Sequence, residues 1–498
     1  MNTVQQTRRN FLKKAGPGAS ALALPRFAGA ARKGPNILFA LADDWSWPFA
    51  GIAGDRSVTS TAFDRVAREG VMFRHAHAVA PTCSASRASI LTGQWFARLG
   101  PGADLWGTLP AKFAVYPDLL ERAGYHVGFT GKGWGPGNWK AGGRERNPAG
   151  PAYQTRTAKP PATGMHRCDY AANFNDFLKQ RGQRQPFCFW YGGFEPHRPY
   201  EKGSGLRAGK KLADARVPPC LPDVPEVRGD LLDYALEIDW FNTHLERMMG
   251  TLERVGELEN TLIVVSGDNG LPFPRCKANL YRWGTNVPLA VRWGETIKGG
   301  RVVDDYISLS DLAPMFLEAA GLKPAAGMTA RSFLDVLTSG DSGWIDPKRN
   351  RVFTGRERHT PAQPNSPGGY PMRAIRTRDY LYIRNYKPDR FPAGSAAGAL
   401  RPYRDIDNSP TKTFMIEHHD DPRVANLFEL GFGKRPAEEL YTLRDDPGQL
   451  KNLAADAHFD AIREKLSAEL TAELKRLKDP RALGGGDAFD HYEYFGKK

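Results

Sequence analysis

Four short apolar runs, each followed by polar residues, constrain the fold of this chain more than any other feature. They occupy residues 37–41, 127–130, 187–191 and 262–265. Continuous apolar runs of this length are typical of parallel strands buried on both faces of a sheet. Amphipathic helical patterns at residues 116–123 and 231–249 lie between them. We therefore predict an α/β fold with a large mixed, mostly parallel sheet flanked by helices.

The polar residues that follow these runs predict a metal site. Ligands of open α/β sheets bind outside the carboxyl ends of the strands, so these residues should meet at one edge. Asp43 and Asp44 follow the first run, and Asp268 and Asn269 follow the last. Their oxygens suit calcium or magnesium better than zinc. Either pair alone is equally typical of a cap or a turn, but the two together favour a metal site.

Residues 83–93, CSASRASILTG, predict a nucleophile that handles an anion. Cys83 supplies a thiol, the small residues let backbone amides approach a negative charge, and Arg87 stands four positions on. Lys132, His197 and Lys277 add positive charge near other strand ends. Two like charges about 4 Å apart repel by ~4 kcal/mol at an effective dielectric of 20. Such a cluster indicates an anionic ligand, although each basic residue alone is also typical of a solvated surface.

These motifs resemble those of the formylglycine-dependent sulfatases over nearly the whole chain after its first 30 residues. The resemblance rests on residues 41–44, 83–93, 131–133, 195–197, 266–270 and 439–447. It implies an alkaline-phosphatase-like fold and oxidation of Cys83 to formylglycine by a formylglycine-generating or anaerobic sulfatase-maturating enzyme. It also implies Ca²⁺ bound by residue 83 with Asp43, Asp44, Asp268 and Asn269.

The resemblance further implies catalytic roles for the basic residues. Arg87 would orient the formylglycine, Lys132 and Lys277 would hold the sulfate oxygens, and His197 would protonate or position the leaving group. Two positions depart from the family pattern. Trp134 replaces a usual histidine, and Ala85 replaces a usual proline, which bears on the choice of maturation system.

Within that family, residues 271–281 and 369–373 look most like the heparan N-sulfatases, which cleave the N-sulfate of glucosamine. We therefore expect a sulfated carbohydrate substrate, with His359 and Arg373 as candidates for reading sugar or carboxylate. A solvated basic face explains those two residues equally well. Three other functions stay open: an O-sulfatase for another polysaccharide, a phosphonate or phosphodiester hydrolase, and a periplasmic glycan-binding protein without activity.

Residues 1–30 predict a twin-arginine signal peptide. Arg8 and Arg9 precede a modest apolar stretch, and Ala28-Gly29-Ala30 fits a cleavage site. No later stretch contains about eighteen apolar residues. We therefore expect export by the twin-arginine translocase to the periplasm or medium, without stable membrane insertion.

Composition narrows the partners only in part. The full chain carries a net charge of +14, and five of its basic residues lie in the first 30, leaving about +9 after cleavage. A basic protein attracts polyanions, but no helix-turn-helix, zinc-finger or RNA-binding signature favours nucleic acid. Four cysteines besides Cys83 show no metal-binding spacing and predict no disulfide connectivity.

The remaining chain divides into three predicted parts. Residues 31–345 form the catalytic α/β domain, and residues 346–480 form a smaller C-terminal α+β subdomain. Within the latter, strands at 351–354, 374–376 and 380–384 precede a helix at 457–478. Residues 481–498, rich in glycine at their start, should form a loose tail.

Overall fold

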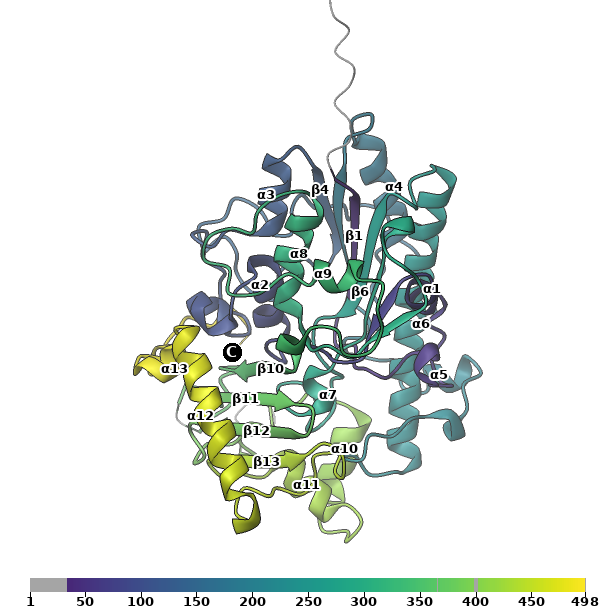
Figure 1. The fold of residues 1–498 in the computed structure, drawn as a ribbon. Helices are drawn as coiled ribbons and strands as arrows, with labels where there is room; N and C mark the ends of the chain where they lie inside the picture. The colour runs from purple at the N-terminus through teal and green to yellow at the C-terminus, as the bar shows by residue number, and fades with distance from the viewer. Residues whose placement is uncertain (1–33, 365, 398–401, 498) are drawn as a thin grey trace, which may run out of the picture.

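The computed structural model describes residues 34–364, 366–397 and 402–497 (Figure 1). The predicted signal peptide, residues 1–30, lies outside these ranges. Within them, no helix is long and apolar enough to cross a membrane.

A seven-stranded sheet forms the middle layer of the larger part of the molecule (Figure 1). Its strands, in spatial order, are β4 (His126–Gly131), β5 (Phe187–Gly192), β1 (Asn36–Ala42), β6 (Thr261–Gly267), β7 (Leu289–Arg292), β2 (Val71–Phe73) and β8 (Arg301–Val303). The first four are parallel, and β7 is antiparallel to both of its neighbours. The four apolar runs are the four parallel strands, which confirms the predicted mixed, mostly parallel sheet.

Helices cover both faces of this sheet because its central strands are apolar on both sides. Leu38 and Ala40 of β1 belong to one buried cluster, and Phe39 and Leu41 belong to the other. The first face packs against α1 (Thr61–Glu69), α4 (Tyr170–Gln180) and α6 (Pro225–Arg254). The second packs against α2 (Cys83–Thr92), α3 (Tyr116–Arg122), α8 (Leu312–Ala319) and α9 (Leu334–Thr338). The result is a three-layer α/β structure.

A second, antiparallel sheet forms the C-terminal part of the molecule. It contains β10 (Arg351–Arg356), β11 (Met372–Thr377), β12 (Tyr380–Asn385) and β13 (Glu438–Thr442), in that order. One face packs against α12 (Asp460–Arg476), whose Leu466, Leu470 and Leu474 are buried against it. The predicted small sheet with a helix against it is therefore present. The boundary at residue 345 stays a prediction.

The remaining strands and α-helices of the described chain are short. They are β3 (Ala76–His77), β9 (Ile307–Ser308), α5 (Ser204–Arg207), α7 (Arg282–Thr285), α10 (Pro410–Glu417), α11 (Ala425–Phe432) and α13 (Pro480–Leu483).

The prediction of a loose C-terminal tail is wrong for the residues that the structure describes. Phe489 is buried, and Asp490 forms an ion pair with Arg390 at 2.7 Å. The Arg358 guanidinium also donates a hydrogen bond to the Tyr492 carbonyl. Glycine-rich sequence suggested flexibility, but these contacts join the segment to the C-terminal sheet.

Candidate active site

A cavity of about 750 Å³ opens at the carboxyl ends of the parallel strands. Of the predicted site residues, six line it: Asp43, Cys83, Lys132, His197, Lys277 and His359. These side chains come from distant parts of the sequence. They meet because β1, β4 and β5, as well as β6, end at this edge of the sheet.

The four predicted oxygen ligands gather beneath this cavity. Ligand atoms of Asp43, Asp44, Cys83 and Asp268 all lie within 4.8 Å of one another. The Asn269 amide nitrogen donates to an Asp44 oxygen at 2.7 Å. The buried Asn269 side-chain oxygen has no hydrogen-bond partner among the residues that the structure describes. A buried carbonyl oxygen normally has a partner. An unsatisfied oxygen beside three buried carboxylates fits a hard divalent cation.

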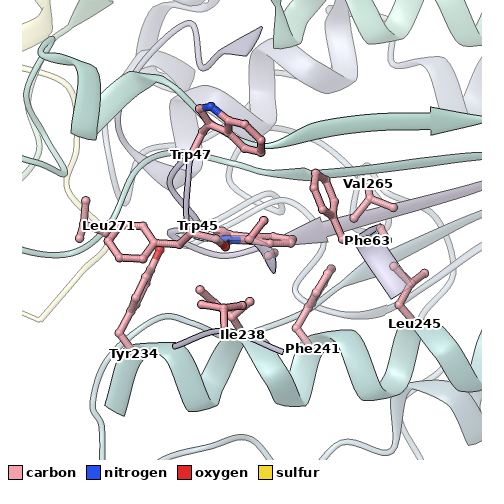
Figure 2. Close-up of a cluster of buried hydrophobic side chains, with 14 of the residues drawn as sticks. Trp45, Trp47, Phe63, Tyr234, Ile238, Phe241, Leu245, Val265 and Leu271 are labelled. Carbon is pink, nitrogen blue, oxygen red and sulfur yellow. Dashed lines mark hydrogen bonds between the residues drawn. The ribbon is translucent and has the colours of Figure 1, made fainter. Parts of the chain in front are cut away.

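Aromatic packing fixes the loop that carries two of these ligands. Trp45 is fully buried between Phe63 and Phe241, with ring centroids 5.2 and 5.8 Å away (Figure 2). The Tyr234 hydroxyl donates to the Asp44 carbonyl at 3.0 Å. Asp44 has a φ of 72°, in the left-handed region that few residues other than glycine, asparagine and aspartate adopt. The core therefore holds Asp44 in place before any ligand binds.

Cys83 is the first residue of α2, directly beside the acidic cluster. Its sulfur lies 3.2 Å from an Asp43 oxygen and 3.9 Å from an Asp44 oxygen. Burial, together with the negative charge of Asp43, raises the pKa of the Cys83 thiol well above its usual range. A thiol that stays protonated is a poor nucleophile. The site therefore does not favour thiolate chemistry, which is consistent with use of residue 83 in an oxidised form.

Three cations face the three carboxylates. Arg87 pairs with Asp268 at 2.7 Å, Lys132 pairs with Asp43 at 2.5 Å, and Lys277 pairs with Asp44 at 2.6 Å. Burial and the neighbouring negative charge of Asp43 raise the pKa of Asp268 to about 7. The pKa of Asp43 is instead held well below its usual range, because Lys132 and other cations outweigh the effect of burial.

His197 and His359 both line the cavity, but their ring nitrogens have different hydrogen-bond partners. The His197 Nδ1 lies 2.5 Å from the Arg198 carbonyl, which accepts only, so Nδ1 carries a proton and donates it there. His197 Nε2, 3.8 Å from an Asp44 oxygen, is the ring nitrogen left for a ligand. His359 is buried and its Nδ1 lies 2.9 Å from the Thr82 hydroxyl, just before α2.

Neither Arg373 nor Trp134 is among the described residues that line the cavity. Arg373 does not reach the cavity: it is fully buried, with ion pairs to Glu357 at 2.6 Å and Asp479 at 2.7 Å. Its proposed contact with substrate is therefore wrong, since both ends of the guanidinium are engaged by acids. Trp134, in place of the usual histidine, is buried, and its indole donates to the Ser84 carbonyl at 3.1 Å. Trp134 therefore holds the start of α2 in place, and the histidines that line the cavity come from other positions.

Three acids that line the cavity had no role in the sequence prediction: Glu195, Glu237 and Asp407. Asp407 lies 3.4 Å from the Lys277 nitrogen, and its carboxylate is within 4.8 Å of ligand atoms of Asp44 and His197. Burial opposes its ionisation, but Lys277 and His197 lower its pKa. Burial raises the pKa of Glu195 to about 7, although the Tyr170 hydroxyl donates to it. Asp407 stands in an irregular loop without periodicity, whereas Glu195 stood in a recognised motif but received no role.

Residues 35–322 match the family model described as Sulfatase. This chain belongs to the sulfatase family. It is 26% identical over 502 residues to human N-sulphoglucosamine sulphohydrolase, covering 93% of this chain and 95% of that protein. It is 27% identical over 449 residues to an ulvan-active sulfatase of Formosa agariphila, covering 89% and 81%. The resemblance to the sulfatases inferred from the motifs is confirmed.

Solved structures show the same fold at low identity. The structure of BT4656 in complex with its substrate D-glucosamine-2-N,6-O-disulfate superposes with a TM-score of 0.64 and 18% identity, covering 90% of this chain and 99% of that one. Phosphonate monoester hydrolase of Agrobacterium radiobacter superposes with a TM-score of 0.61 and 17% identity, covering 89% and 96%. This sulfatase therefore shares its fold with these structures.

Proposed function

We propose that this sulfatase removes the N-sulfate of glucosamine from heparan or heparin fragments, using a formylglycine made from Cys83. The observation that carries the chemistry is the position of Cys83, in contact with the acidic cluster and within the cavity that Lys132 and Lys277 line. The N-sulfate assignment is supported by similarity to N-sulphoglucosamine sulphohydrolase along 95% of that protein's length.

The proposed cation site supplies charge compensation at the sulfuryl group. Calcium would be held by Asp43, Asp44, Asp268 and Asn269, and when bound it would polarise oxygens at residue 83 and on the sulfate. The three buried carboxylates and the three basic side chains of Arg87, Lys132 and Lys277 balance each other. A divalent cation would make this set net positive, which favours binding of an anionic sulfate.

The oxidised residue 83, when hydrated, would supply a hydroxyl that attacks sulfur and a second hydroxyl whose deprotonation releases sulfate. Lys132 and Lys277 would stabilise charge on the sulfuryl oxygens, a preorganised role worth several kcal/mol. His197 Nε2 is the nitrogen available to protonate the leaving nitrogen or oxygen. Asp407, whose carboxylate lies within 4.8 Å of a His197 ring nitrogen, would stabilise positive charge that develops near the leaving group.

The route to the active protein is also a proposal. We expect a formylglycine-generating or anaerobic sulfatase-maturating enzyme to modify Cys83 before folding is complete, because the residue is buried in the finished fold. Ala85, which lies in α2, replaces the proline of the usual motif and so bears on which of the two enzymes recognises it. Export by the twin-arginine translocase to the periplasm or medium follows from the sequence of residues 1–30.

A panel of defined substrates tests the proposal. Purified protein is incubated with N-sulfoglucosamine, glucosamine 6-O-sulfate, an ulvan fragment and an aryl phosphonate, and released sulfate or phosphonate is measured. We expect sulfate from N-sulfoglucosamine, with none from the matched Cys83→Ala variant. Preference for an O-sulfate would support the O-sulfatase alternative, and turnover of only the phosphonate would support the hydrolase alternative. Calcium-dependent binding without turnover would indicate a glycan-binding protein.

A further inference from the structure

A second pocket, of about 230 Å³, lies where the large sheet layer meets the C-terminal sheet. It shares no lining residue with the active-site cavity. Four arginines and two histidines line it: Arg74, Arg282, Arg376, Arg378, His75 and His77. No aspartate or glutamate is among its lining residues in the part of the chain that the structure describes. A concave basic surface without acids is suited to an anion.

Arg376 is the residue that most clearly lacks a partner. Only 6% of it is exposed, and its buried Nη2 has no hydrogen-bond partner within the described ranges of the chain. Burial and the positive charge of Arg282 lower the pKa of its guanidinium to about 10. Of the four arginines, only Arg74 forms an ion pair among the described residues, with Asp304 at 3.1 Å. A buried cation is costly unless an opposite charge and hydrogen bonds satisfy it.

Flat aromatic groups line up beside this basic pocket. The His75 ring stacks on Tyr306 and on Trp344, with centroids 5.0 and 5.6 Å apart. Trp344 is 37% exposed, and the Arg378 guanidinium lies over its ring at 3.5 Å. Burial lowers the pKa of His75 to about 4, so its ring stays neutral and presents an apolar face. Apolar rings next to cations suit a sugar ring that carries an anionic substituent.

We infer that this pocket is a second glycan-binding site, which takes a sulfate or carboxylate group of a sulfated oligosaccharide away from the reacting centre. Arg376 would bind the anion from below, Arg282 and Arg378 would bind it from the rim, and the exposed edge of the Trp344 indole would contact the sugar. The identity of the ligand as a glycan rests on the proposed function. The preference for an anion rests on Arg376 and the absence of acids from the lining described above.

The test uses the full chain carrying Cys83→Ala, which binds substrate without turnover. Binding of a heparin tetrasaccharide is measured by calorimetry in this host, in Arg282→Gln/Arg378→Gln, and in Arg122→Gln/Lys298→Gln. The last pair removes the same charge from exposed positions outside both pockets. We expect two sites in the host and the control, and loss or at least tenfold weakening of one site in the Arg282/Arg378 variant. Equal affinity and stoichiometry in all three would overturn the inference.

Two further measurements separate the possible ligands and failures. Arg376→Met should lose the same site. If Arg376→Met does not fold, the result for Arg282→Gln/Arg378→Gln decides the question. Inorganic sulfate is titrated in parallel, and binding of sulfate here without binding of the tetrasaccharide would overturn the assignment to glycan. In the unmutated Cys83 background, Arg282→Gln/Arg378→Gln should turn over a small aryl sulfate within twofold of the parent. Failure of the proposed function would instead abolish turnover in the parent as well.

Discussion

Replacing Lys277 by methionine tests the electrostatic role assigned to the cavity. The side chain is 5% exposed, and its nitrogen lies 2.6 Å from Asp44 and 3.4 Å from Asp407. Methionine has a similar length but no charge. Lys277→Met therefore removes a cation from the point where the sulfuryl oxygens would bind, and it changes the shape of the cavity little.

The expected loss follows from the distance over which such a cation acts. A unit charge about 3 Å from a sulfuryl oxygen interacts with another unit charge by about 5.5 kcal/mol at an effective dielectric of 20. If about half a charge develops on that oxygen in the transition state, the lost stabilisation is about 2.8 kcal/mol, or roughly 100-fold in rate. Because the substrate's sulfate is already negatively charged when it binds, loss of the cation should also weaken substrate binding and raise KM.

The assay compares kcat/KM for N-sulfoglucosamine and an aryl sulfate in Lys277→Met and Lys210→Met. Lys210 is a matched control because it also pairs with an aspartate at 2.6 Å, and neither residue of that pair lines the cavity. Both variants lose an ion pair, but only Lys277→Met should lose at least about 100-fold in kcat/KM for both substrates. A Lys277→Met enzyme within about threefold of the parent would refute the proposed contact with the sulfuryl group.

Three other predictions follow from the same site. The pKa of Asp268 is raised to about 7, and the proposed calcium ion would bind the ionised carboxylate, so calcium affinity should weaken as the pH falls below about 7, by up to about tenfold per pH unit. Calcium titration between pH 5 and 8 checks this, and a flat profile contradicts it. Asp407→Asn should lower kcat/KM about tenfold for N-sulfoglucosamine and much less for an aryl sulfate, because the leaving group of an aryl sulfate needs no proton. Equal losses for the two substrates would show that Asp407 does not act on the leaving group. Arg373→Gln should lower the free energy of unfolding by about 3–5 kcal/mol in denaturant titrations, because it leaves Asp479 buried without its cation and Glu357 with Arg481 alone. Unchanged stability with a raised KM would instead restore its role in binding substrate.

The sheet and its ligand edge could be predicted because their signals are local and strong. Continuous apolar runs indicated β1, β4, β5 and β6, and topology alone brings their polar ends together. Asp43 and Lys132 thus became neighbours in the prediction without any knowledge of their distance, and the structure places them 2.5 Å apart.

The C-terminal half was less predictable because its contacts are non-local. Arg373 carries the same charge whether it faces a cavity or lies between two acids, and one of those acids, Asp479, is 106 residues away. The tail's packing on Arg390 and Arg358 has no periodic signal. Asp407 likewise acquires its importance only because the fold brings it to Lys277.

The chemical state of residue 83 in active protein tests the central claim most directly. The peptide containing residues 83–93 is isolated from protein that releases sulfate, and its mass is determined with and without an aldehyde-specific label. The account predicts an aldehyde at position 83, in an amount that rises and falls with specific activity across preparations. Full sulfatase activity from protein whose residue 83 is entirely unmodified cysteine would contradict it.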